Sequence, residues 1–158
     1  MFIDNITKFK KDIFILLSFF ILSRLFYYKF LNIEFDTWTI DLYWQYFPKD
    51  LLKDDLINSL IHNHNQAPFL NLMVGLMMKI KNKYLILIQL IYLAFGFLSF
   101  LFIYFICREF NFKEKISLII TIILMIFPTT ILYENHLYKE YLTFFFLVYL
   151  FYCTIKSN

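Results

Sequence analysis

The stretch that decides the fold is YLILIQLIYLAFGFLSFLFIYFIC, residues 84–107. It contains 24 consecutive residues without a charge and lies between Lys83 and Arg108. As an α-helix it would be about 36 Å long, which is enough to cross the hydrocarbon core of a bilayer with some tilt. The sequence therefore predicts a membrane-spanning helix here.

The composition of the whole chain agrees with this prediction. Of its 158 residues, 61% are hydrophobic and 17% are charged, whereas soluble domains have about 45–50% and about 25%. Only 2 Gly and 3 Pro are present, which excludes collagen-like and disordered classes. A net charge of +3, scattered along the chain, excludes a nucleic-acid-binding protein. We expect an integral membrane protein.

Three further apolar stretches predict additional spans, at about residues 13–33, 116–133 and 137–155. Pro128 lies near the end of the third span, where we expect it to bend or end the helix. The expected fold is therefore all-α, a polytopic transmembrane bundle of about four spans in a single membrane domain, residues 1–158.

Basic residues near the span ends predict the orientation of the bundle. Lysines precede the first span, and Arg108, Lys113 and Lys115 fill the short link between the second and third spans. We expect the N-terminus and this link to lie in the cytoplasm. The segment of about residues 34–83 would then be a long external loop.

This loop contains two segments that predict helices too short to span. Residues 48–62 repeat leucine every four positions, which is typical of a helix lying along the membrane surface. Residues 67–78 form a 12-residue apolar run, which predicts a second interfacial helix. The expected fold thus adds two interfacial helices to the four spans.

The candidate catalytic residues lie at the start of the loop, directly after the first span. Asp36 and Asp41 lie in the segment DTWTIDLYWQ, residues 36–45, together with Trp44. Partly buried carboxylates beside flat aromatic faces suit a general base that acts on a sugar or lipid hydroxyl. The alternative is an ordinary aromatic belt with solvated acids.

Several other polar residues each have two possible roles. Arg24 lies within the first apolar run, where a cation could bind a lipid phosphate or could snorkel to the interface. His62 and His64, with His136, could ligate a metal or could be polar loop residues. Glu134 and Asn135 lie in a polar and aromatic turn, residues 133–141, which could form a second wall of a site or an interfacial turn.

Three segments together resemble the GT-C superfamily of membrane glycosyltransferases, and the nearest branch looks like the bacterial protein-mannosyltransferase-like proteins. The first segment is the acidic and aromatic start of the loop, residues 36–45. The second, HNQAPFLN at residues 64–71, is similar to a His-x-Gln-Pro-Pro-Leu-x-Asn motif, with Ala67 in place of the first proline. The third, PTTILYEN at residues 128–135, is similar to a Pro-x-x-x-Leu-Tyr-Glu-Asn turn.

The resemblance implies an inverting transfer of a sugar from a polyprenyl-phosphate donor to an acceptor hydroxyl on the external face of the bacterial inner membrane. An aspartate of the first loop would be the general base, Asp41 first and Asp36 second. The residues implied in substrate binding are Glu134, Asn135, His64, Gln66, Trp44 and Arg24. Some family members use a divalent metal and others do not, so the cofactor stays open.

The family core has at least seven spans, so the resemblance corresponds to the N-terminal portion of such an enzyme. We expect the chain to be inactive alone and to need a second polypeptide or further spans. The competing interpretation is a small non-enzymatic membrane protein, such as a scaffold or assembly subunit.

Overall fold

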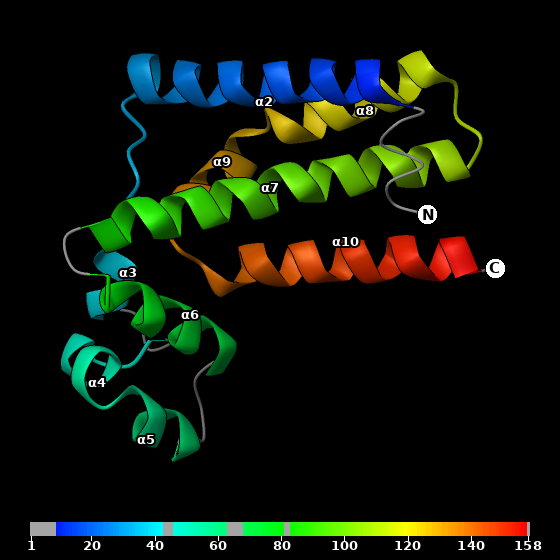
Figure 1. The fold of residues 1–158 in the computed structure, drawn as a ribbon. Coiled ribbons are helices and arrows are strands. Elements are labelled where there is room, and N and C mark those ends of the chain that lie inside the picture. The colour runs from blue at the N-terminus through cyan, green and yellow to red at the C-terminus, as the bar shows by residue number, and fades with distance from the viewer. Residues whose placement is uncertain (1–8, 43–45, 63–67, 81–82, 158) are drawn as a thin grey trace.

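The computed structural model describes residues 9–42, 46–62, 68–80 and 83–157, and within them all regular structure is helical (Figure 1). Long helices run side by side, with α7 between α2 and α10 in this view and α8 behind them. A group of short helices, α3 to α6 (residues 38–78), lies at one end of the long helices. We call this group the loop unit. The long helices are α2 (Lys10–Leu31), α7 (Tyr84–Glu109) and α10 (Lys139–Ser157).

Two helices, α2 and α7, are long and apolar enough to cross a membrane. The apolar stretch expected as the third span, about residues 116–133, forms two helices, α8 (Glu114–Met125) and α9 (Pro128–Asn135). The two are bent by 54° and make a third span if they are counted as one broken span. These findings confirm an all-helical fold with two or three candidate spans and indicate a membrane protein. The expected fourth span corresponds to α10, which is not among the helices that meet these criteria, so the count of four is not confirmed.

The break between α8 and α9 lies at the expected proline. Pro128 is the first residue of α9, and Phe127 before it is extended, with φ −65° and ψ 130°. Proline disfavours a helical conformation in the preceding residue but fits the first turn of a new helix. The chain therefore changes direction here, and the last carbonyls of α8 lose their helical partners.

In the loop unit, the expected helix at residues 48–62 is divided into α4 (Lys49–Asp54) and α5 (Leu56–Ile61). Asp55 breaks the helix with φ −134°. Both helices pack on α6 (Pro68–Met78) at Gly75, where a Cβ atom would lie 2.5 Å from Leu56 Cδ1 and 2.9 Å from the Leu52 carbonyl oxygen. Leu52 and Leu56, on either side of the break, therefore both contact the same glycine. A short helix that the sequence pattern did not predict, α3 (Trp38–Leu42), precedes them.

Buried hydrogen bonds hold the loop unit together and join it to the segment between α9 and α10. The Tyr46 hydroxyl donates to the Leu137 carbonyl oxygen at 2.5 Å, and both residues are buried. Burial raises the pKa of Tyr46, so its hydroxyl keeps its proton and remains a donor. The Phe47 N–H donates to the Asn71 side-chain oxygen at 2.8 Å. These bonds lie within a hydrophobic cluster that also contains Tyr92 and Tyr141 of the long helices.

Candidate functional site

A buried ion pair joins α2 to α9. Arg24 Nε donates to Glu134 Oε1 at 2.9 Å, and Arg24 Nη2 donates to Glu134 Oε2 at 2.7 Å. The exposed fractions of the two side chains are 12% and 1%. Two parallel bonds of this kind are the strongest arrangement that a guanidinium and a carboxylate can adopt. Arg24 thus points into the bundle and pairs with Glu134.

The remaining donor groups of Arg24 also have protein partners. Nη1 donates to Ser23 Oγ and to the Met125 carbonyl oxygen, both at 3.0 Å. The guanidinium carbon lies 3.8 Å from the centre of the Phe20 ring. Met125 ends α8, so Arg24 satisfies a carbonyl that the break before Pro128 leaves without a helical partner. The arginine therefore stabilises the bend as well as the carboxylate.

A tyrosine of α10 completes this network. The Tyr141 hydroxyl donates to Glu134 Oε2 at 2.5 Å. Gly96 of α7 packs against both groups so closely that an added Cβ would clash with the Tyr141 hydroxyl and would lie 2.7 Å from Glu134 Oε2. Four helices, α2, α7, α9 and α10, therefore meet at one carboxylate.

Sequence reasoning did not single out Tyr141 or assign a role to Gly96. Tyr141 is seven residues after Glu134, at the end of the polar and aromatic turn, and this position was the only signal for it. Gly96 is not part of a G-x-x-x-G pattern, so nothing in the sequence linked it to a polar group on another helix.

Asp36 lies beside Asn135. Its backbone N–H donates to the Asn135 carbonyl oxygen at 2.8 Å, and its carboxylate accepts a hydrogen bond from the Trp38 N–H at 2.9 Å. Asp36 lines an open pocket of about 400 Å³ together with Glu34 and His136. The structure therefore brings together two predicted site residues that are about a hundred positions apart in the chain.

A neighbouring pocket of about 340 Å³ extends this region toward the ion pair. Its polar lining includes Arg24, Gln89 and Asn135. Ile33 lines both pockets, so they are adjacent. Arg24, Glu134, Asn135 and Asp36 thus form one polar region, which we call the Asp36 site.

Asp41 has a different environment. Its carboxylate pairs with Lys49 Nζ at 2.7 Å, and the exposed fractions of the two side chains are 41% for Lys49 and 51% for Asp41. Asp41 does not line either pocket of the Asp36 site. The structure therefore separates the two candidate bases, and an ammonium group already occupies the Asp41 carboxylate.

Three predicted site residues, Trp44, His64 and Gln66, lie outside the residues that the structure describes.

Among the described residues, no group of three or more His, Cys, Asp or Glu side chains could hold a metal ion. His62 contacts the Asn58 carbonyl oxygen at 2.9 Å, and the Nδ1 atom of His136 is buried without a partner among the described residues. Since the described residues do not fit a metal site, we derive no chemical step through a metal.

Comparison with models of known protein families, with curated proteins and with solved structures finds no match for this chain.

Proposed function

We propose that this protein is the loop-bearing part of a GT-C-type membrane glycosyltransferase, with a polyprenyl-phosphate-linked sugar as donor and a hydroxyl as acceptor. One observation carries the proposal. The hydrogen bond from Asp36 to Asn135 joins the acidic start of the loop to the turn after the third apolar stretch. These are two of the three segments on which the resemblance to this superfamily depends, and the bond places a carboxylate in an open pocket beside them.

In this proposal Asp36 is the general base. Its carboxylate takes the proton of the acceptor hydroxyl, and the resulting oxygen attacks the anomeric carbon of the donor sugar. The bond from that carbon to the lipid phosphate breaks with its electron pair on the phosphate oxygen, so the configuration inverts. Asp41 is the second candidate, because a hydroxyl would first have to displace Lys49 from it.

Arg24 and Glu134 have a positioning role in the same proposal. Arg24 donates to Glu134, Ser23 and Met125, so its charge is balanced inside the chain. The pair holds α9 against α2, and α9 carries Asn135, which binds the Asp36 backbone. Cations for the donor phosphate would then come largely from other residues or from a second polypeptide.

The proposed topology has four spans in the bacterial inner membrane, with α10 as the fourth and the N-terminus in the cytoplasm. Support for α10 comes from the ion pair between Lys156 Nζ and Glu109 Oε1 at 2.7 Å, which joins the ends of α10 and α7. α10, with 19 residues, thus lies along the 26-residue α7 and ends beside its C-terminal end.

The test is allele replacement in the source cells, where any completing polypeptide is present. Membranes from cells lacking the protein should lose one transfer activity from a labelled polyprenyl-phosphate sugar, and the wild-type chain should restore it. Asp36→Asn should restore none, although the variant accumulates normally. If cells without the protein keep every such transfer, or if Asp36→Asn and Asp41→Asn both restore it fully, the proposal is wrong.

The scaffold interpretation has its own supporting observation. The network of Arg24, Glu134 and Tyr141 is closed within the chain, as expected for a purely structural element. A scaffold would be needed for the abundance of another membrane protein, and Asp36→Asn would support that role as well as the wild type does. The same set of strains therefore separates the two functions.

A further inference from the structure

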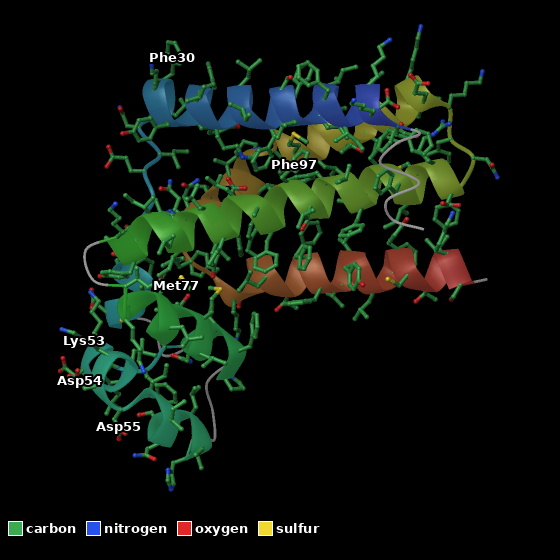
Figure 2. The ribbon with its side chains drawn as sticks, viewed as in Figure 1. Phe30, Lys53, Asp54, Asp55, Met77 and Phe97 are labelled. Carbon is green, nitrogen blue, oxygen red and sulfur yellow. The ribbon has the colours of Figure 1, made fainter. Side chains whose placement is uncertain are left out.

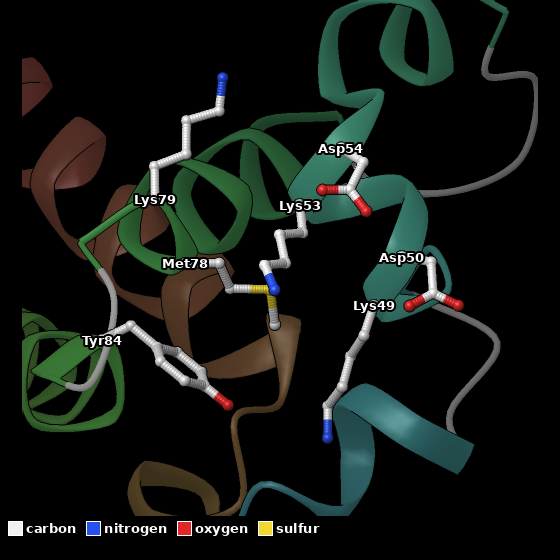
Figure 3. Close-up of a pocket in the computed structure, with 7 residues that line it drawn as sticks. All are labelled: Lys49, Asp50, Lys53, Asp54, Met78, Lys79 and Tyr84. Carbon is white, nitrogen blue, oxygen red and sulfur yellow. The ribbon is translucent and has the colours of Figure 1, made fainter.

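A second polar pocket lies away from the Asp36 site, between the loop unit and the start of α7 (Figure 3). Its volume is about 810 Å³, and three lysines line it, Lys49, Lys53 and Lys79. Pockets that bind small ligands are commonly about 300–1,000 Å³ in volume. The proposed glycosyl transfer does not use this pocket.

Two of these lysines stay outside ion pairs in the described part of the chain, although Asp50 and Asp54 also line the pocket. Lys49 pairs with Asp41, whereas Lys53 and Lys79 form no ion pair within the described residues. In Figure 3 the Lys53 ammonium and the Tyr84 hydroxyl point toward the pocket centre, next to Met78, while Asp50 points away from Lys53. The centre of the pocket therefore offers donors beside an apolar side chain.

The position of this pocket relative to the spans indicates what it contacts. Tyr84 is the first residue of α7, a helix that is long and apolar enough to span a membrane. Tyrosine and lysine are typical of span ends, where side chains reach the lipid headgroups. The pocket thus lies at the level of the headgroups.

The helix beside the pocket has the character of a membrane-surface helix. α6 has 11 residues, ten of them apolar or small, which is too few to span. Leu76 of α6 and Ile80 after it are exposed, and Phe69 contacts Phe146 of α10 with ring centres 5.9 Å apart. An exposed apolar surface next to lysines is the pattern of a surface that binds anionic lipids.

We propose that this pocket binds the phosphodiester headgroup of an anionic phospholipid. Lys53 and the Tyr84 hydroxyl donate to the phosphate oxygens, and Met78 contacts the glycerol carbons. Lys79 also lines the pocket, and its ammonium, which points away from Lys53 in Figure 3, attracts the anionic headgroup by its charge. The proposal is independent of glycosyl transfer, because it uses no residue of the Asp36 site.

The test measures binding of phosphatidylglycerol and of phosphatidylcholine to the full-length protein in detergent by native mass spectrometry. We expect phosphatidylglycerol to be preferred. Lys53→Gln and Lys79→Gln should each weaken this binding about fivefold, the usual effect of one lysine near an anionic lipid. Asp54→Asn should strengthen it, because Asp54 also lines the pocket and repels the phosphate.

The matched control is Lys29→Gln, which removes an exposed lysine from the last turn of α2. Far-ultraviolet circular dichroism shows whether each variant keeps its helix content. The proposal is overturned if folded Lys53→Gln and Lys79→Gln variants bind as the wild type does, or if Lys29→Gln loses as much. Displacement of phosphatidylglycerol by equimolar inorganic phosphate or by a polyprenyl monophosphate would also overturn it, because the ligand would then be free phosphate or the sugar donor's lipid.

Discussion

The Glu134 carboxylate accepts hydrogen bonds from Nε and Nη2 of Arg24, at 2.9 and 2.7 Å, although the two residues are 110 positions apart in the chain. Figure 2 shows the packed helices with their side chains. The two charges balance each other in a region where each alone would be costly, because a charge buried away from water loses its hydration. The pair therefore specifies how α2 and α9 are placed relative to each other.

Removing both members of this pair should destabilise the protein by less than the sum of the two single removals. Glu134→Gln leaves the Arg24 charge buried without its counter-ion, a change that costs about 3–5 kcal/mol when a buried pair is broken. Arg24→Met should have a similar effect. The double variant Arg24→Met, Glu134→Gln should lose less than the sum, as measured by thermal unfolding in detergent. Additive losses would show that the two side chains do not interact.

Gly96 and Tyr141 should show coupled effects. Gly96→Ala puts a methyl group against the Tyr141 hydroxyl and the Glu134 carboxylate, and overpacking of this kind costs about 1–3 kcal/mol. Tyr141→Phe removes a hydrogen bond to a charged acceptor, which contributes about 1.5–3 kcal/mol. Because the Tyr141 hydroxyl is the atom nearest to the new methyl group, the double variant should lose less than the two single losses together.

The control for this pair is Ala94→Val, which enlarges an exposed side chain of the same helix. It should leave the unfolding midpoint nearly unchanged. An equally small effect of Gly96→Ala would contradict the close packing of α7 against Glu134 and Tyr141.

Both candidate bases should tolerate replacement by asparagine. Asp36→Asn keeps an oxygen that accepts the Trp38 N–H, and Asp41→Asn removes only an exposed ion pair, which contributes about 0–1 kcal/mol. The thermal midpoint of each variant in detergent should therefore stay close to that of the wild type. Asp36→Ala removes the acceptor and should cost about 1 kcal/mol. Equal midpoints for Asp36→Ala and Asp36→Asn would contradict the role of this hydrogen bond.

Cysteine labelling should place the ends of the helices on two sides of the membrane. In a variant with Cys107 and Cys153 replaced by serine, single cysteines are introduced in turn at the exposed positions Glu34, Lys113 and Ser157. With four spans, a membrane-impermeant thiol reagent should reach positions 113 and 157 from one side and position 34 from the other. Labelling of position 157 from the same side as position 34 would show that α10 does not cross.

Much of the helical framework could be predicted from the sequence because it depends on local properties. The uncharged stretch at residues 84–107 predicts α7, and the structure extends it only to Glu109. Pro128 predicts the break in the third apolar stretch, because its ring and its missing N–H act on the adjacent turn. The apolar run at residues 67–78 predicts α6, which begins at Pro68 and ends at Met78.

The split of the other interfacial helix could not be predicted in this way. The leucine spacing at residues 48–62 is equally compatible with one continuous helix. The break itself is a property of the backbone at Asp55, with φ −134° and ψ 41°, and nothing in the leucine spacing marks that residue.

The sequence by itself determined that the protein is helical and apolar, where its longest helices run and where proline interrupts one of them. These features follow from hydropathy and backbone constraints within about 20 neighbouring residues. Only the tertiary structure decided that Arg24 and Tyr141 both donate to Glu134, and that Asp36 lies beside Asn135 while Asp41 pairs with Lys49. Such partners depend on how distant helices pack, since a buried charge can be balanced by any opposite charge that the fold brings within reach.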